Sequence, residues 1–285
     1  MERKLQAILS QQSMTNLKFV LGSLDFLNGK KCIKPSYVIT KKPKDYDNWK
    51  VVYGIPGCYR PVLDLDWWWF SFLRAYCDGT ITAGQTLRDD PALDFSNIIA
   101  KYPDLQQLYK QESLPCEYAA ELFKKKFLVM SRKLDLETII KCKLFTSNYA
   151  NITILDNSKL EHDLVTKYEA TKSFLDQHHI SIAPPEVNTF SKAVEYLQKE
   201  KNVRRVHIEA GPRLYQDYFY DNSLDNPMDL VVITVLVPKG EIPVENIGNP
   251  FPPIGIVLKK YNLVYTSKGV EDHSGTWNFL VFEKN

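Results

Sequence analysis

Apolar positions follow two different periods along the chain, and their alternation predicts an α/β protein. Helical spacing marks the first thirty residues, the tryptophan-rich stretch from Asp64 to Arg74, Leu105 to Gln111, Leu160 to Gln177, Phe190 to Lys199 and the segment ending at Tyr220. Short apolar runs predict strands at Ser36–Thr40, Val51–Tyr53, Gly79–Ala83, Lys124–Met130, Ile152–Leu155, Ser181–Ala183, Arg205–Glu209, Leu230–Val237, Ile256–Leu258, Leu263–Thr266 and Trp277–Phe282.

The order of these elements predicts the sheet. Strands that alternate with helices indicate a mostly parallel central sheet flanked by helices, and the last strands, which follow one another directly, predict an antiparallel C-terminal edge. Leu230 to Val237 is apolar throughout, as in a strand buried on both faces. We expect residues 1–50 to form an N-terminal helical extension with the first strand, and residues 51–285 to form one α/β domain.

The stretch Trp67-Trp68-Trp69 belongs to a helix that is apolar nearly all round, with Asp64 or Asp66 as its expected cap. Such a helix has to be covered on every side. Burial in the chain's own core is the favoured interpretation. The alternative is a subunit interface, because tryptophan is enriched among interface anchors. That alternative predicts a homodimer or a place in a larger assembly.

Composition narrows the classes of protein. The chain has 285 residues, of which 44% are hydrophobic and 25% charged, as in ordinary globular proteins. A net charge of +2 argues against electrostatic capture of nucleic acid, and no apolar run reaches the roughly 18 residues that span a bilayer. The five cysteines are odd in number and lack C-x-x-C spacing, so we expect neither a disulfide framework nor a zinc site. A reducing intracellular compartment is expected, the cytoplasm first, with an organelle such as the mitochondrion as the alternative.

Two segments carry candidate chemistry. In the first, the strand Gly79–Ala83 runs into Gly84-Gln85-Thr86; in the second, Arg205–Glu209 runs into Ala210-Gly211-Pro212. Ligands of open α/β sheets bind at the carboxyl ends of strands, where small residues permit close approach and a threonine hydroxyl can meet a phosphate. Glu209 could bind a ribose hydroxyl or a substrate amine. The alternative is that both are ordinary turns, with Glu209 as a surface carboxylate near a helix start.

Taken together, the motifs resemble a known family. Five motifs are similar in order and spacing to those of the C-terminal reductase domain of the bifunctional riboflavin-biosynthesis deaminase–reductase. They are Leu73-Arg74, Asp78, Gly84-x-Thr86, Asp89-Asp90-Pro91 and Glu209-Ala210-Gly211-Pro212. The resemblance runs from about Val51 to the C-terminus. It implies a dihydrofolate-reductase-like fold and NADPH-dependent reduction of a ribosylamino-pyrimidine phosphate, a reaction in which the cofactor supplies the chemistry and the protein positions the groups.

The resemblance also implies residue roles. The substrate would be faced by Arg74 and Glu209, and no catalytic or metal-binding residue is assigned. NADPH would contact Gly84, Thr86, Asp89, Gly211, Pro212, Arg213 and Leu214.

The chain departs from the family pattern mainly on the substrate side. Where the family has Ser-Leu-Asp-Gly-Lys, this chain has Lys41-Lys42-Pro43-Lys44. The family's Gly-x-Ser-x-Trp stretch is replaced by Gly57-Cys58-Tyr59-Arg60, and one of its glycines is replaced by Ala210. Two hypotheses therefore stand side by side. The chain is either a divergent NADPH-dependent reductase of a small molecule, or a non-catalytic descendant that serves as a structural or interaction subunit.

Overall fold

The computed structural model describes residues 2–39, 45, 47–52, 63–92, 101–112, 114–115, 123–131, 134–146, 150–155, 168–211, 214–241, 247–271 and 275–285. The chain forms two compact units. The first unit comprises Met1–Phe72 and Pro212–Asn285, and the second comprises Leu73–Gly211.

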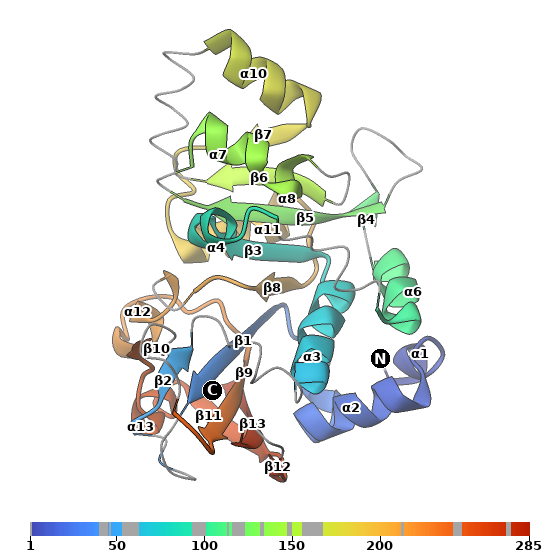
Figure 1. The fold of residues 1–285 in the computed structure, drawn as a ribbon, viewed down its shortest axis with the longest axis vertical. Coiled ribbons are helices and arrows are strands. Elements are labelled where there is room, and N and C mark those ends of the chain that lie inside the picture. Colours follow the sequence, from blue (N-terminus) through green and yellow to red (C-terminus); the bar gives the residue numbers. More distant parts are fainter. Residues whose placement is uncertain are drawn as a thin grey trace. The chain divides into compact units, whose positions relative to one another are not determined.

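The second unit is built on a parallel sheet in the order β8-β3-β5-β6-β7 (Figure 1). Its strands are β3 (Gly79–Ala83), β5 (Phe123–Met130), β6 (Ala150–Leu155), β7 (Ile180–Ile182) and β8 (Val206–Ile208). Ile81 aligns with both Ile208 of β8 and Leu128 of β5, so the apolar rows continue across the sheet. A short strand, β4 (Leu114–Pro115), adds to β5 in the antiparallel sense.

Helices connect the strands of the second unit. They are α4 (Gly84–Asp89), α6 (Pro103–Glu112), α7 (Leu136–Lys141), α8 (Lys143–Thr146), α10 (Tyr168–Gln177) and α11 (Phe190–Lys199). Helix α11 shows why these segments fold. Thr189 caps it by accepting a hydrogen bond from the Lys192 amide, and its apolar stripe, which includes Ala193 and Leu197, is buried.

The first unit contains the mixed part of the sheet (Figure 1). Strand β1 (Cys32–Ile39) is parallel to β9 (Leu230–Pro238), β9 is antiparallel to β13 (Gly275–Lys284), and β13 is antiparallel to β11 (Tyr261–Thr266). The remaining strands are β2 (Lys50–Val52), β10 (Ile247–Pro250) and β12 (Val270–Glu271). All residues of β9 up to Leu236 are buried, as its unbroken apolar run predicts.

The N-terminal segment is helical, as its spacing predicts. It forms α1 (Glu2–Gln6), α2 (Gln11–Leu21) and a 3-10 turn η1 (Leu24–Leu27). Ser10 caps α2, and Gly22, with φ +77°, ends it in a conformation that favours glycine. Helix α2 lies against β13 of the same unit, and the Tyr265 hydroxyl donates to the Phe19 carbonyl oxygen at 3.1 Å.

The tryptophan-rich helix α3 (Leu63–Tyr76) is packed into the chain's own core. Trp68 and Trp69 are 2% and 0% exposed, both rings stack on Phe72, and the Trp68 indole N–H donates to the Ser13 hydroxyl of α2 at 3.1 Å. These two indoles are therefore not available to anchor another chain, which corrects that part of the interface hypothesis. The side chain of Trp67 lies outside the described residues.

The predicted fold class, an α/β fold with a largely parallel sheet and an antiparallel C-terminal edge, is confirmed. Two local predictions are wrong. Ile256–Leu258 is not a strand, because Pro253 starts a helical turn, α13 (Ile254–Val257); three apolar residues are too few for periodicity to distinguish the two structures. Asp64 and Asp66 do not cap α3, since that helix already begins at Leu63.

Among the described segments, none of the helices could cross a membrane. Finally, α12 (Asp217–Tyr220) is a single turn.

Candidate functional site

The two small-residue turns leave neighbouring parallel strands of the second unit. Strand β3 ends at Ala83 and β8 ends at Ile208, and these strands pair directly. The Glu209 amide then donates to the Ile81 carbonyl oxygen at 2.8 Å, so the chain after β8 stays beside β3. Both turns therefore begin at the same carboxyl edge of the sheet, the place where ligands of open α/β sheets bind.

Gly84 allows α4 to start close to the end of β5. A Cβ placed at Gly84 would overlap Ser131 Cβ and would lie 3.2 Å from Leu134 Cγ. The Ser131 hydroxyl accepts a hydrogen bond from Arg88 of α4 at 3.1 Å. The absence of a side chain at Gly84 is thus required by packing within the protein, independently of any ligand.

The polar side chains of α4 differ in the hydrogen bonds that they already make within the protein. Asp89 is exposed, and its carboxylate accepts a hydrogen bond from the Gln85 amide at 2.5 Å. Arg88 donates to the same Gln85 side chain at 2.6 Å, which links three side chains along the helix surface. Thr86 is half-buried, and its hydroxyl makes no hydrogen bond with the described residues. Thr86 is therefore better placed than Asp89 to bind a phosphate.

The second turn offers space for a ligand. A Cβ placed at Gly211 would meet no atom of the described residues within 4 Å, whereas Ala210 is only 2% exposed and packs inside the protein. Pro212 and Arg213, both expected to contact a cofactor, lie outside the described residues. Leu214 is half-buried and belongs to the first unit. Gly211 is thus an open backbone position at the carboxyl edge of the sheet.

Arg74 and Glu209, both expected to face the substrate, bind each other. Arg74 comes from the last turn of α3, and its guanidinium donates two hydrogen bonds to the Glu209 carboxylate, one through Nε and one from NH2 to Oε2 at 2.7 Å. The two side chains are 5% and 6% exposed. The alternative that Glu209 is a surface carboxylate is therefore wrong. A buried bidentate pair of this kind is strongly directional, and removing either partner leaves an uncompensated charge.

His207 is a further member of this cluster that the sequence reasoning did not select. Its Nδ1 lies 3.3 Å from Glu209 Oε1, and its side chain is fully buried. The signal was present in the sequence, because alternate residues of a strand point to the same face and His207 precedes Glu209 by two. The carboxylate of Glu209 is thus enclosed by Arg74 on one side and by an imidazole on the other.

Thr82 brings one more polar group to the carboxyl end of β3. Thr80 aligns with His207, so Thr82, two residues further on, lies on the same face of the sheet as His207. The Thr82 side chain is 0% exposed, and its hydroxyl has no hydrogen-bond partner among the described residues. A buried polar group of this kind is uncommon in folded proteins.

The motif residue Asp78 has a structural role at the opposite end of β3. Its buried carboxylate accepts hydrogen bonds from the Arg204 amide and guanidinium at 3.1 and 2.8 Å, and from the Arg205 amide at 2.7 Å. Glu112 of α6 also accepts from both arginines. Asp78 therefore joins β3 to the chain entering β8 and takes no part in the candidate site.

Comparison with known proteins identifies the fold. No family model and no curated protein sequence matches the chain. Among solved structures, a pyrimidine reductase-like protein from Corynebacterium diphtheriae superposes with a TM-score of 0.55 at 17% identity, covering 95% of this chain and 98% of that one. Riboflavin biosynthesis reductase Rib7 of Saccharomyces cerevisiae gives a TM-score of 0.49 at 13% identity, with 97% and 100% of the two chains covered. The first of these likenesses shows that the chain shares the fold of that pyrimidine reductase-like protein.

Proposed function

We propose that this chain is a divergent NADPH-dependent reductase that acts on a ribosylamino-pyrimidine phosphate or a related small molecule. The observation that carries the proposal is the convergence of the two turns, which begin on adjacent strands at one carboxyl edge and leave an open backbone position at Gly211. The resemblance in motif order supplies the cofactor class. The fold of a pyrimidine reductase-like protein supports the proposal without identifying a substrate.

The residues on the cofactor side suit a dinucleotide. The Thr86 hydroxyl is available as a donor, and Gly211 allows a phosphate to approach the backbone. The proposed cofactor contacts are completed by Gly84, Asp89, Pro212, Arg213 and Leu214. NADPH, when bound, supplies a hydride. The protein's own part is to hold the substrate's acceptor carbon near the nicotinamide and to exclude water.

On the substrate side, the proposal assigns Arg74 and Glu209 a joint role. Each holds the other in one orientation, with His207 behind the carboxylate. A preorganised, charge-balanced pair can bind neutral hydroxyl and amine groups of a substrate through its remaining acceptor and donor positions. It is less suited to neutralising a phosphate, because its charges already compensate each other. We therefore expect a substrate that is recognised mainly through polar, uncharged groups at this point.

NADPH binding by the intact chain tests the proposal. A ligand present at 100 times its dissociation constant adds about 2.7 kcal/mol to the unfolding free energy, so thermal unfolding should shift upward with NADPH. Thr86→Val should weaken binding, whereas Thr15→Val, a matched change on the exposed face of α2, should not. Absence of any shift at millimolar NADPH would remove the reductase proposal, and an unchanged affinity in Thr86→Val would remove the role given to that hydroxyl.

A second candidate function is that of a non-catalytic, reductase-like subunit of a larger assembly. It is favoured by the buried cluster of Arg74, Glu209 and His207, in which the charged groups contact one another. In that case the two turns serve folding alone, as Gly84 already does through its packing against Ser131. Size-exclusion chromatography with light scattering separates the candidates. A monodisperse monomer or homodimer that binds NADPH contradicts the subunit role, and an aggregating chain without NADPH affinity supports it.

A reducing intracellular compartment is proposed for either candidate. Cys77 and Cys142 are buried and form no disulfide. Buried thiols of this kind are typical of proteins that fold where disulfides are rare.

A further inference from the structure

The Thr82 hydroxyl is a buried polar group that lacks a hydrogen-bond partner. Thr82 is the fourth residue of β3, and its side chain is fully buried. Its Oγ1 makes no hydrogen bond with the described residues. A hydroxyl that is removed from water and left unbonded destabilises the folded chain. A threonine at this position therefore needs a reason other than packing.

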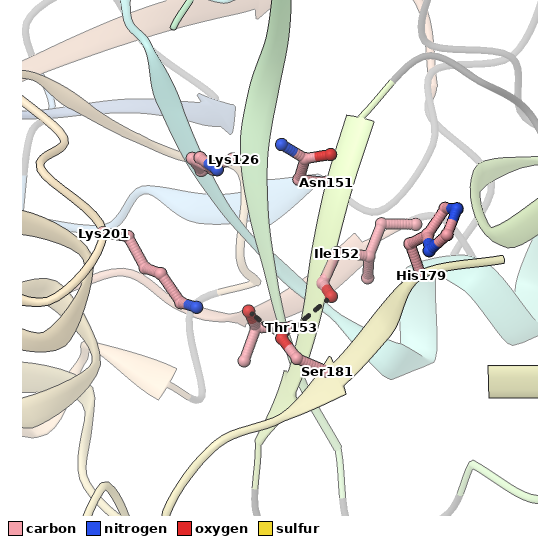
Figure 2. Close-up of a pocket in the computed structure, with 7 residues that line it drawn as sticks. All are labelled: Lys126, Asn151, Ile152, Thr153, His179, Ser181 and Lys201. Carbon is pink, nitrogen blue, oxygen red and sulfur yellow. Dashed lines mark hydrogen bonds between the residues drawn. The ribbon is translucent and has the colours of Figure 1, made fainter. Parts of the chain in front are cut away.

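Thr153 of β6 shows how a buried threonine is accommodated elsewhere in the same sheet. It is also buried, and its Oγ1 lies 2.9 Å from the Ser181 hydroxyl of β7, so each hydroxyl has a partner (Figure 2). Thr82 has the same β-branched shape without that bond. Valine, which is also β-branched, would fill the position of Thr82 without an unbonded polar atom.

The register of β3 and β8, which are neighbours in Figure 1, places Thr82 opposite Glu209. Ile81 aligns with Ile208, and the Glu209 amide donates to the Ile81 carbonyl oxygen at 2.8 Å, which continues the ladder by one residue. Alternate residues of a strand share a face, so Thr82 lies on the face that carries His207 and Glu209. Adjacent strands are about 5 Å apart. The Thr82 side chain is therefore one strand spacing from that of Glu209.

The two sides of Thr82 differ in character. Toward β5 its neighbour is Val129, which is apolar and fully buried. Toward β8 its neighbour is Glu209, whose side chain keeps some exposure, and Ala83 at the end of β3 is half-buried. Because Thr82 itself is fully buried, its hydroxyl is reached by a group that has already entered beside Glu209. Such a group is a ligand of the candidate site.

The chemistry of the two side chains selects the kind of group. A threonine hydroxyl both donates and accepts, whereas a carboxylate only accepts, and the charge of Glu209 is balanced by Arg74. An alcohol hydroxyl is neutral and both donates and accepts, so it suits both side chains. A phosphate oxygen has no proton to give to Glu209. A sugar or sugar alcohol, with hydroxyls on neighbouring carbons, can meet both residues.

We propose that Thr82 is a specificity-determining residue, whose hydroxyl bonds a hydroxyl group of a sugar or sugar-derived ligand that is bound against Glu209. The inference rests on the proposed function, which makes this edge of the sheet the ligand site. The ligand supplies the partner that the Thr82 hydroxyl lacks in the chain alone. Thr82 therefore lowers the stability of the ligand-free chain and increases its selectivity for the ligand.

Thermal unfolding of the full chain, titrated with D-ribose 5-phosphate as the probe, tests the proposal. Thr82→Val should raise the melting temperature of the ligand-free chain, because a methyl group replaces an unbonded hydroxyl. The same variant should weaken the affinity for the probe about fivefold to tenfold, as expected for one lost hydrogen bond. Thr82→Ser, which keeps the hydroxyl, should bind the probe like the parent chain.

Thr153→Val is the matched control. It removes a buried hydroxyl that has a partner, so it should lower the melting temperature and leave the affinity for the probe unchanged. Opposite shifts in the two valine variants distinguish an unbonded hydroxyl from a bonded one.

Four results would overturn the role of Thr82. They are an unchanged probe affinity in Thr82→Val, a lower melting temperature of that variant without ligand, an equal response to inorganic phosphate, and no saturable response to the probe. NADPH is titrated separately. A chain that binds the probe through Thr82 but not NADPH keeps the role of Thr82 and removes the reductase proposal. A chain that binds NADPH but whose Thr82→Val variant keeps the parent's probe affinity does the reverse.

Discussion

Lys125 provides the sharpest test of the physical reasoning about this fold. It lies on β5, and its side chain is 1% exposed. The ammonium group donates to the Ala75 carbonyl oxygen at 2.9 Å and lies 4.7 Å from the centre of the Tyr109 ring. Burial lowers the pKa of Lys125 from its ordinary value of 10.5 to about 7, since the charged form loses its hydration.

The sign and size of the effect follow from proton linkage. Between pH 7 and 10.5 the unfolded chain binds a proton at Lys125 that the folded chain has released, so stability rises with pH in this window. A difference of 10.5 − 7 = 3.5 pKa units corresponds to about 5 kcal/mol of destabilisation at pH values below 7. We expect Lys125→Met to remove this destabilisation. The variant leaves the Ala75 carbonyl without its donor, which costs about 1 to 3 kcal/mol, so a net gain of about 2 to 4 kcal/mol is expected at pH 6.

Urea unfolding at pH 6.0, 7.0, 7.5, 8.0 and 8.5 measures both the gain and the slope. The parent chain should gain about 1 kcal/mol per pH unit from Lys125 above pH 7, and Lys125→Met should lack that gain. The range stops at pH 8.5 because burial raises the pKa of the Cys77 thiol from 9.0 to about 12, and the release of its proton in the unfolded chain cancels about half of the Lys125 slope by pH 9. Lys141→Met, at an exposed helix position, is the control. A Lys125→Met variant with the parent's slope, or one less stable than the parent at pH 6, would refute the argument.

Three further predictions concern stability, each measured by urea unfolding at constant pH. Gly84→Ala should cost about 1 to 3 kcal/mol, because the added methyl overlaps Ser131; a neutral result would show that α4 can shift and that packing does not require this glycine. Trp68→Phe should cost about 1 to 3 kcal/mol through the lost hydrogen bond to Ser13 and the volume removed from the core, and a loss below about 0.5 kcal/mol would contradict burial of that indole. Thr189→Ala should cost about 1 kcal/mol as a lost helix cap, and Thr189→Ser should restore most of it.

Much of the fold was accessible from the sequence because it depends on local pattern. The strand Gly79–Ala83 and the helix Phe190–Lys199 have the predicted bounds, since small and branched residues at a period of two, or a capped amphipathic stripe, decide structure over a few residues. Where the pattern was too short, as at Ile256–Leu258, the same reasoning failed. Pro253, three residues before the predicted strand, directs that segment into a helical turn.

The candidate site was accessible only in part. The small-residue turns and Glu209 stood out because their residue types are unusual at a strand end. The ion pair between Arg74 and Glu209 did not stand out in the sequence, because no local rule pairs two residues that are 135 positions apart. His207 was missed for a related reason. An imidazole within an apolar strand has no evident role until the carboxylate beside it is known to be buried.

The order and type of the secondary structure and the two turns at strand ends follow from the residues alone, because backbone preference and hydrophobic period act between near neighbours. Which charged groups meet depended on the folded arrangement: Asp78 with Arg204 and Arg205, and Arg74 with Glu209. Electrostatic interactions depend on distance in space and on exclusion of water. Both arise only after the sheet has brought distant segments together.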